Sequence, residues 1–194
     1  MIAAVVLLAA IGIERLAELV VSARNARWSL EHGGREFARG QILPMIVMHV
    51  GLILGCIVEW WLAGRFLPWL GWPMLVLVVL ANGLRWWCIG VLGRQWCIRV
   101  IVVPGLSAVT KGPYRRLPHP NYLAVAVEGA ALPLVFTGWI TALAFTVFNA
   151  VLLLGFRIPA ENRALAQLSP AEAAALPPRH DGVTVQGDAD PKGS

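Results

Sequence analysis

The segment Ile42-Leu-Pro-Met-Ile-Val-Met-His-Val-Gly-Leu-Ile-Leu-Gly-Cys-Ile-Val-Glu-Trp-Trp-Leu-Ala63 is almost entirely apolar. A helix needs roughly 20 such residues to cross about 30 Å of hydrocarbon, and this segment is long enough. Further apolar segments lie on both sides of it, at about Ile2 to Val21, Leu67 to Gly90, Tyr122 to Phe136 and Trp139 to Phe156. The sequence therefore predicts about five transmembrane helices. The last two should form a helical hairpin, because only Thr137-Gly138 separates them.

The composition of the whole chain favours a membrane protein. Of its 194 residues, 58% are hydrophobic and 14% are charged, and the mean hydropathy is +0.68, whereas an average soluble domain is about 25% charged. We expect an all-α integral membrane protein in which residues 1–168 form one domain and residues 169–194 a flexible C-terminal tail. The three cysteines have neither the number nor the spacing typical of a disulfide framework or a metal site, so no metal is predicted.

The basic residues predict the orientation of the chain. Four Lys or Arg residues lie between Ser22 and Gln41 and six between Arg85 and Pro120, whereas the loop from Ala63 to Pro68 holds one. Basic loops stay in the cytoplasm, which predicts an outer N-terminus and a cytoplasmic C-terminus. A signal peptide at Met1 to Ile13 is the competing interpretation, but that segment has no basic start. Since the net charge of +5 comes mainly from these loops, we expect membrane lipids and no nucleic acid as partners.

Ionisable and amide side chains interrupt the apolar segments. They include Glu14, Arg15, Glu18, Asn82, Arg85 and Glu128. Interhelical hydrogen bonds and ion pairs are one explanation for such residues. For Glu128 a functional role is equally well supported, because it lies about two turns beyond His119 on a helix that should begin near Asn121. We therefore predict Glu128 to be a substrate-binding residue.

The most informative loop is Lys111-Gly-Pro-Tyr-Arg-Arg-Leu-Pro-His-Pro-Asn-Tyr122, just before an apolar helix. Its glycine and prolines predict an irregular backbone, and inside a membrane such backbone lines a cavity. The loop can present Tyr114, Arg115, Arg116, His119 and Tyr122 to a polar ligand. A basic loop that contacts anionic headgroups is the alternative.

A second informative segment, Phe156-Arg-Ile-Pro-Ala-Glu-Asn-Arg-Ala-Leu165, follows the last apolar stretch. Arg157 and Glu161 are four residues apart and should share one helical face. Taken alone, this spacing is typical of an ordinary helix ion pair. Its position matters more, because the predicted topology places it on the same side of the membrane as the His119 loop.

At these two segments the sequence resembles the isoprenylcysteine carboxyl methyltransferase-like family. The family pattern is roughly G-P-Y-R-x-x-R-H-P-x-Y, followed after a helical hairpin by R-x-x-x-E-E-x-x-L, and the resemblance covers about Arg94 to Leu168. Two positions depart from it, since Pro118 replaces an arginine and Asn162 replaces the second glutamate. Within the family, Ile98-Arg-Val-Ile-Val-Val-Pro-Gly105 together with Asn121 is most similar to bacterial enzymes that O-methylate alkylpyrones.

The resemblance implies a methyltransferase dependent on S-adenosylmethionine in a bacterial inner membrane, with a cytoplasmic active site. It implies that the cofactor is bound by Tyr114, His119, Pro120 and Tyr122, and that Arg157 and Glu161 are catalytic. The acceptor would be a lipophilic small molecule from the bilayer, such as an alkylpyrone, with a functional link to a type III polyketide synthase.

Three other functions remain open at this stage. A carboxyl methyltransferase acting on a prenylcysteine-like acceptor is a close variant of the first hypothesis. Because sterol reductases resemble the family in their C-terminal region, a nicotinamide-dependent membrane reductase is the second. The third is a membrane scaffold or small transporter without enzymatic activity.

Overall fold

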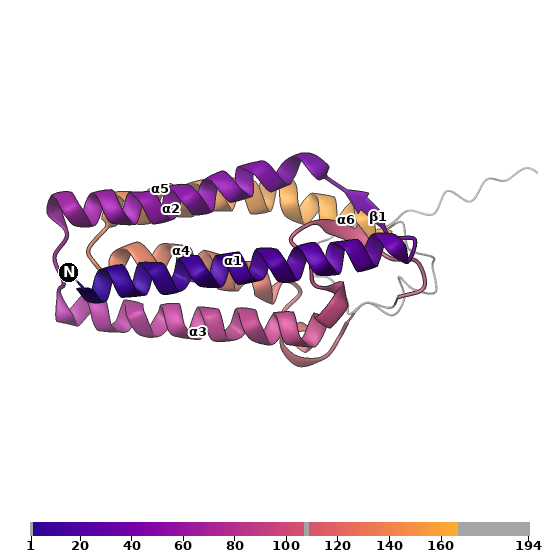
Figure 1. Cartoon of the computed structure of the whole chain (residues 1–194), viewed down its shortest axis with the longest axis horizontal. Helices are drawn as coiled ribbons and strands as arrows, with labels where there is room; N and C mark the ends of the chain where they lie inside the picture. The colour runs from indigo at the N-terminus through magenta and orange to yellow at the C-terminus, as the bar shows by residue number, and fades with distance from the viewer. Residues whose placement is uncertain (1, 107–108, 167–194) are drawn as a thin grey trace, which may run out of the picture.

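The computed structural model describes residues 2–106 and 109–166, and most of them are helical (Figure 1). The elements are α1 (Ile2–Glu31), β1 (Arg35–Phe37), η1 (Arg39–Gln41), α2 (Ile42–Ala63), α3 (Pro68–Leu92), η2 (Gly93–Gln95), β2 (Val100–Val102), η3 (Gly112–Arg115), α4 (Pro120–Leu134), α5 (Trp139–Leu152), η4 (Leu153–Arg157) and α6 (Ile158–Ala166). The tail predicted at residues 169–194 lies outside the described residues.

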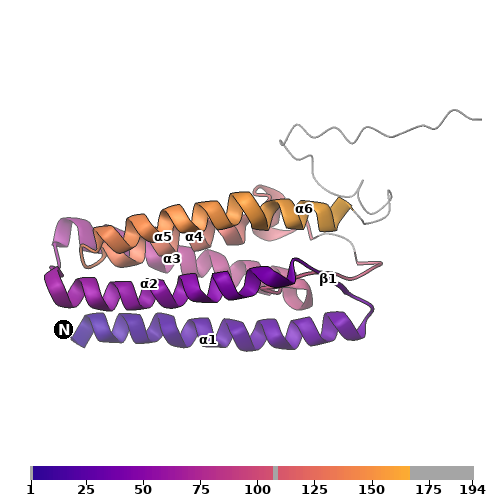
Figure 2. The same ribbon diagram turned by 90° about the horizontal axis from the view of Figure 1, so that it is seen from above.

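The helices α1 to α5 lie side by side along one direction, and successive helices run antiparallel (Figures 1 and 2). The described chain starts at one end of this bundle, and α6 and β1 lie at the opposite end, which we call the α6 end (Figure 1). Helix α3 packs closely along α4, and α5 packs on α4 and α2. Helix α1 makes its closest backbone approach at the α6 end, where it contacts η2 and β2.

The first helix is longer than the sequence predicted. The loop expected from Ser22 continues α1 for almost three further turns, to Glu31. Ser22, Asn25 and Ser29 are buried on one face of this extension. The Asn25 side chain donates to the Gly93 carbonyl at 3.0 Å and to the Trp96 carbonyl at 2.8 Å. A hydropathy pattern does not detect a polar helix face that is buried against polar backbone groups. The prediction of a loop from Ser22 was therefore wrong.

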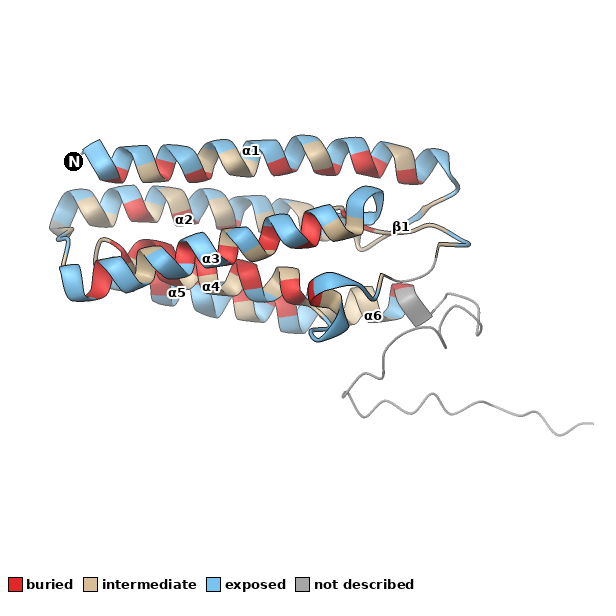
Figure 3. Cartoon of the chain, turned by 90° about the horizontal axis from the view of Figure 1, so that it is seen from below, coloured by how far each residue is buried: buried red, intermediate tan, exposed pale blue. Residues whose placement is uncertain are grey.

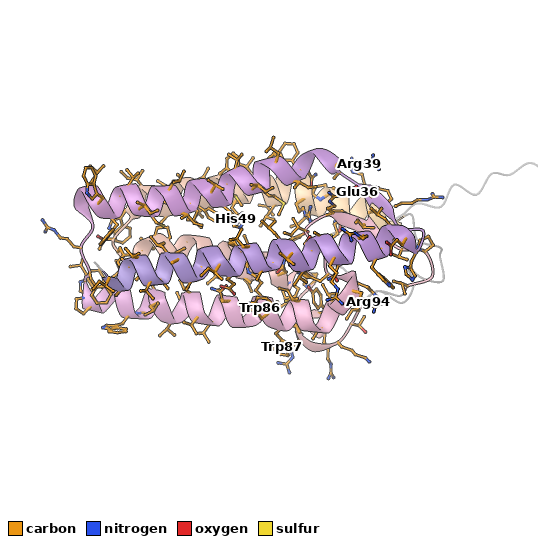
Figure 4. The ribbon with its side chains drawn as sticks, in the orientation of Figure 1. Glu36, Arg39, His49, Trp86, Trp87 and Arg94 are labelled. Carbon is orange, nitrogen blue, oxygen red and sulfur yellow. The ribbon has the colours of Figure 1, made fainter. Side chains whose placement is uncertain are left out.

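The prediction of an all-α fold omitted a small sheet. Strands β1 and β2 pair antiparallel, with Arg35 opposite Val102 and Phe37 opposite Val100. The Glu36 carboxylate lies 3.4 Å from Arg99 and 3.4 Å from Arg39 and holds the strands together at the α6 end (Figure 4). Since α6 contacts both strands, this sheet fixes the end of the bundle at which α6 docks.

Among the described residues, three helical segments are long and apolar enough to cross a membrane. They are Arg39–Leu62, Pro68–Gln95 and Trp139–Ala164, which correspond to α2, α3 and the continuous helix from α5 to α6. Helix α4 has 15 residues, fewer than a span requires, and α1 carries Glu14, Arg15 and Glu18. The chain therefore has membrane helices, whereas the predicted number of five is not confirmed.

The surface of the bundle is apolar. Buried residues face the interior of the bundle and exposed ones face outward (Figure 3). Outward-facing side chains include Val47, Val79, Ile140 and Leu154, each more than half exposed. A soluble protein avoids large exposed apolar patches, so this outer surface suits hydrocarbon.

The α4–α5 hairpin is closed by the Thr137-Gly138 turn that the sequence predicted. Thr137 adopts a positive φ of 60°, and Gly138 donates to the Pro133 carbonyl at 2.9 Å. Across the turn, the Glu59 carboxylate of α2 accepts the backbone N–H groups of Ile140 at 3.0 Å and Thr141 at 2.9 Å. Glu59 thus caps the free N–H groups at the start of α5, where a negative charge is favourable.

Replacing Glu59 with alanine should therefore destabilise the hairpin by about 1 kcal/mol, because two N–H groups lose their acceptor. Thermal unfolding in detergent measures this effect. The Glu59→Gln variant is the matched control, since it keeps one acceptor oxygen and should melt between the alanine variant and the wild type. Equal melting temperatures for the alanine variant and the wild type would contradict the capping role.

Candidate active site

A polar cluster at the α6 end joins the two sequence segments singled out above. The Tyr122 hydroxyl at the start of α4 donates to the Glu161 carboxylate of α6 at 2.5 Å. Arg157 Nε donates to the same hydroxyl at 3.1 Å. The His119 ring stacks on the Tyr122 ring with 5.2 Å between centroids, and its Nδ1 lies 3.7 Å from Glu161. We call these four side chains the inner cluster.

Arg157 reaches the inner cluster because the helix is widened there. Residues Leu153–Arg157 form one turn of π-helix between α5 and α6, a feature frequently found at functional sites. The Gln41 side chain at the start of α2 donates to the Phe156 carbonyl at 3.1 Å. Arg157 itself is 5% exposed and donates to the Ile98 carbonyl before β2. The π-helical turn thus directs a buried guanidinium between α4 and the β2 segment.

The loop before α4 has the irregular backbone that its glycine and prolines predicted. Gly112 has a φ of +58°, and a Cβ there would meet the Val91 side chain at 2.8 Å. Tyr114 lies half-buried against Cys88 of α3; burial and the interaction with Cys88 raise the pKa of its phenol. Because Glu161 and Tyr122 also act on this phenol, Tyr114 lies beside the inner cluster.

A second polar cluster lies deeper in the bundle and includes Glu128. Arg85 of α3 donates to Glu128 of α4 and, at 3.3 Å, to Glu18 of α1. Arg15 donates to Glu18 at 2.9 Å and lies 3.5 Å from Glu128. We call these four side chains the deep cluster. Glu128 thus lies among ion-pair partners and makes no described contact with the inner cluster.

The predicted site residues divide between these places. His119, Tyr122, Arg157 and Glu161 come together in the inner cluster, and Tyr114 lies beside them. Pro120 is fully buried in the first turn of α4, where it starts the helix. Arg115 and Arg116, which the sequence also offered as ligand contacts, are exposed.

Two contributors to the site, and one buried amide of α5, were not among the predicted site residues. Gln41 and Cys88 hold the π-helical turn and Tyr114 through single contacts from distant segments. Asn149 of α5 is 2% exposed, and its side-chain oxygen has no hydrogen-bond partner. An isolated amide in an apolar stretch was the only available hint for Asn149, and nothing pointed to the other two.

The residues at the α6 end fit the groups of S-adenosylmethionine. This molecule has a sulfonium, an ammonium, a carboxylate, hydroxyls and an adenine ring, and it needs an anionic partner, hydrogen-bond donors and acceptors, and an aromatic surface. Glu161 offers the carboxylate, and the stacked His119 and Tyr122 rings offer the aromatic surface. The buried side-chain oxygen of Asn121, beside Tyr122, has no hydrogen-bond partner and can accept from an amino group.

The fold and this site define a small helical membrane protein with a polar site at one end. In comparisons with known proteins, the isoprenylcysteine carboxyl methyltransferase (ICMT) family matches residues 74–167. The uncharacterized protein YpbQ of Bacillus subtilis (strain 168) is 36% identical over 165 residues, which cover 84% of this chain and 96% of that protein. No solved structure matches the chain.

The chain belongs to the ICMT family, as the relative of nearly full length and the match to the C-terminal half together show. The family implies a membrane methyltransferase, and its members use S-adenosylmethionine. The matched residues include the whole inner cluster together with Arg85 and Glu128 of the deep cluster, whereas Arg15 and Glu18 lie before them.

Proposed function

We propose that the protein is an S-adenosylmethionine-dependent methyltransferase that methylates an oxygen of a hydrophobic acceptor at the α6 end. The observation that carries this proposal is the Tyr122 hydroxyl, which joins Glu161 and Arg157 at hydrogen-bond distance. This hydroxyl belongs to the first of the two segments that match the family pattern, and Glu161 and Arg157 belong to the second. Tyr114, His119, Pro120 and Tyr122 form the donor side of this site, and Arg157 lies on the acceptor side. Glu161 contacts Tyr122 and lies near His119, so it lies between the two sides, where it can face both the sulfonium of the donor and the acceptor oxygen.

When bound, the donor supplies a methyl group on a positively charged sulfur. The chain aligns the donor and the acceptor in a water-poor site. This alignment can lower the barrier to methyl transfer by about 7 kcal/mol. The Arg157 guanidinium is fixed by the Ile98 carbonyl and Tyr122, so it can favour loss of the proton from the acceptor hydroxyl, which makes the oxygen a better nucleophile for the methyl group. Glu161 is partly exposed and can take the hydroxyl proton and pass it to water.

The apolar outer surface favours an acceptor that comes from the bilayer. An enolic lipid such as an alkylpyrone has an acidic hydroxyl on an apolar chain, and the resemblance of residues 98–105 to alkylpyrone enzymes supports this acceptor class. A prenylcysteine-like carboxylate is the second acceptor to test. A functional link to a type III polyketide synthase belongs to the same proposal.

The proposed setting is a bacterial inner membrane with five helices, α1 to α5, inside it. The N-terminus is then outside and the α6 end lies in the cytoplasm. Basic side chains at that end, among them Arg27, Arg39 and Arg116, support this orientation, because positive residues stay on the cytoplasmic side.

Titration of S-adenosylmethionine into the purified protein in detergent tests the proposed function directly. We expect saturable binding by calorimetry and competition by S-adenosylhomocysteine. The Tyr122→Phe variant should bind more weakly by about tenfold, because Glu161 and Arg157 lose their shared partner. A wild-type protein that binds no S-adenosylmethionine but binds reduced nicotinamide would refute the proposal in favour of a reductase.

A further inference from the structure

The deep cluster lies where a membrane protein rarely keeps charges. Arg85 and Glu18 are 3% and 4% exposed, and they come from helices separated widely in sequence. Charged residues inside a membrane bundle are costly and commonly mark a functional site. With Glu14, which lies 3.6 Å from Arg15, the group has three carboxylates and two guanidinium groups. A neutral, protonated head group therefore suits this cluster better than an anion does.

The deep cluster also has unused hydrogen-bonding capacity. Glu18 Oε1, Arg15 Nε and Arg85 Nε are buried and have no hydrogen-bond partner. The first of these atoms accepts a hydrogen bond and the other two donate one. Buried polar groups of native proteins are nearly always paired. A ligand that carries a hydroxyl and a carbonyl or carboxyl oxygen has the complementary groups.

The rim of this cluster faces the lipid side of the bundle. Trp86 of α3 is 41% exposed and donates its indole N–H to Glu14 of α1 at the seam between these helices (Figure 4). Arg15 of α1 also bridges to Asn82 of α3, at 3.0 Å. The described contacts across this seam are made by long polar side chains, whereas α3 and α4 pack closely. Side chains of this kind can move aside for a molecule arriving from the bilayer.

The deep cluster lies close to the inner cluster. Glu128 is six residues after Tyr122 on α4, which corresponds to about 9 Å along the helix axis. On α3, Arg85 lies one turn before Cys88, which contacts Tyr114. Glu128 and Tyr122 lie on different faces of α4, because six residues turn the helix by about 240°. The shortest described path from the deep cluster to the inner cluster therefore runs from Arg85 along α3 to Cys88 and Tyr114.

We propose that Arg15, Glu18, Arg85 and Glu128 bind the oxygen-bearing head group of the lipid acceptor, which enters across the seam between α1 and α3. This inference rests on the proposed methyltransferase function and names the acceptor side of that site. Its chemical class is a lipid with an enol or carboxylic acid group, bound in its neutral, protonated form, and with a long apolar chain. The hydroxyl donates to Glu18 Oε1 and the carbonyl oxygen accepts from the arginine Nε atoms, and this holds the head group between the deep cluster and the inner cluster.

The experiment compares the wild type with the double variant Arg85→Met and Glu128→Met. Replacing a buried ion pair with apolar side chains of similar volume often leaves stability unchanged, so this variant should fold. The probes are a tritiated long-chain 4-hydroxy-2-pyrone, an S-farnesyl thiocarboxylic acid and, for each, an alkyl analogue without head-group oxygens. Equilibrium binding is measured in nanodiscs, and S-adenosylmethionine binding is measured in parallel. Glu59→Gln, which changes a carboxylate at the opposite end of the bundle, is the matched control.

We expect the wild type and the control to bind at least one oxygen-bearing probe about tenfold more tightly than its analogue, and the double variant to lose this preference while it binds the donor normally. A folded double variant that keeps the preference would overturn the inference, as would a wild type without any preference. If the double variant does not fold, Glu18→Gln replaces it, and this variant should also lose the preference for the oxygen-bearing probe. A wild-type protein that does not bind S-adenosylmethionine refutes the proposed function instead. Failure of the further inference and failure of the proposed function are therefore distinguishable.

Discussion

Replacing Arg157 with alanine should lower the rate of methyl transfer at least about 100-fold, which corresponds to the loss of one or two hydrogen bonds from a charged donor. The guanidinium is buried and contacts both Tyr122 and the Ile98 carbonyl. Its removal breaks the contacts that link Tyr122 of α4 to the segment before β2, where we propose that the acceptor oxygen binds. The loss should appear in the turnover rate with donor saturating, because Arg157 is assigned to the acceptor side.

The control for this prediction is Arg163→Ala, which removes an exposed arginine from α6, the helix that directly follows Arg157. It should retain wild-type turnover. Arg157→Lys keeps the charge without the planar fork and should recover only part of the rate. Circular dichroism and elution volume in detergent establish that each variant is folded. A folded Arg157→Ala protein with full turnover would refute the assignment of the catalytic side chain.

The largest expected effect on stability comes from Gly129, at the closest approach of α4 and α5. A Cβ at this position would lie 1.8 Å from Cε1 of Phe145, which is itself buried in the core. Gly129→Ala must therefore displace the buried Phe145 ring or push the two helices apart. Such overpacking typically costs about 1–3 kcal/mol, and we expect the upper part of this range because the clash is with a ring inside the α4–α5 hairpin.

Thermal unfolding in detergent measures this destabilisation. Gly83→Ala is the matched control, because a Cβ on that helical glycine meets nothing within 4 Å. It should leave the melting temperature unchanged or raise it, since alanine favours a helix by up to about 1 kcal/mol over glycine. Combining Gly129→Ala with Phe145→Leu should restore part of the loss. If Gly129→Ala has the same melting temperature as the wild type, the close packing at Gly129 does not contribute to stability.

Much of the helical framework could be predicted from the sequence. The boundaries of α2 and α3 agree with the prediction to within two residues, and the Thr137-Gly138 turn and the start of α5 also follow from long apolar runs with a short break between them. The predicted end of the last helix at Phe156 was wrong, because the helix continues through the π-helical turn into α6. The extension of α1 could not be found in this way, because Ser22, Asn25 and Ser29 are buried against polar partners from the segment after α3. Burial of polar groups depends on their partners, which a single segment does not reveal.

Only part of the candidate site could be predicted from the sequence, for a similar reason. His119, Tyr122, Arg157 and Glu161 lie in two short segments with distinctive spacing, and the structure brings them together. Their roles in binding and catalysis remain predictions. Gln41 reaches the π-helical turn through one contact, which a pattern along the chain does not encode.

The sequence by itself determined that this is a helical membrane protein of the ICMT type with its polar motifs near the C-terminal end, because apolar length and motif spacing are local properties. The tertiary structure decided which charges meet. It placed Glu128 beside Arg85, Arg15 and Glu18, and Tyr122 between Glu161 and Arg157. Ion pairs between helices depend on how the helices pack against one another, and local spacing does not specify that packing.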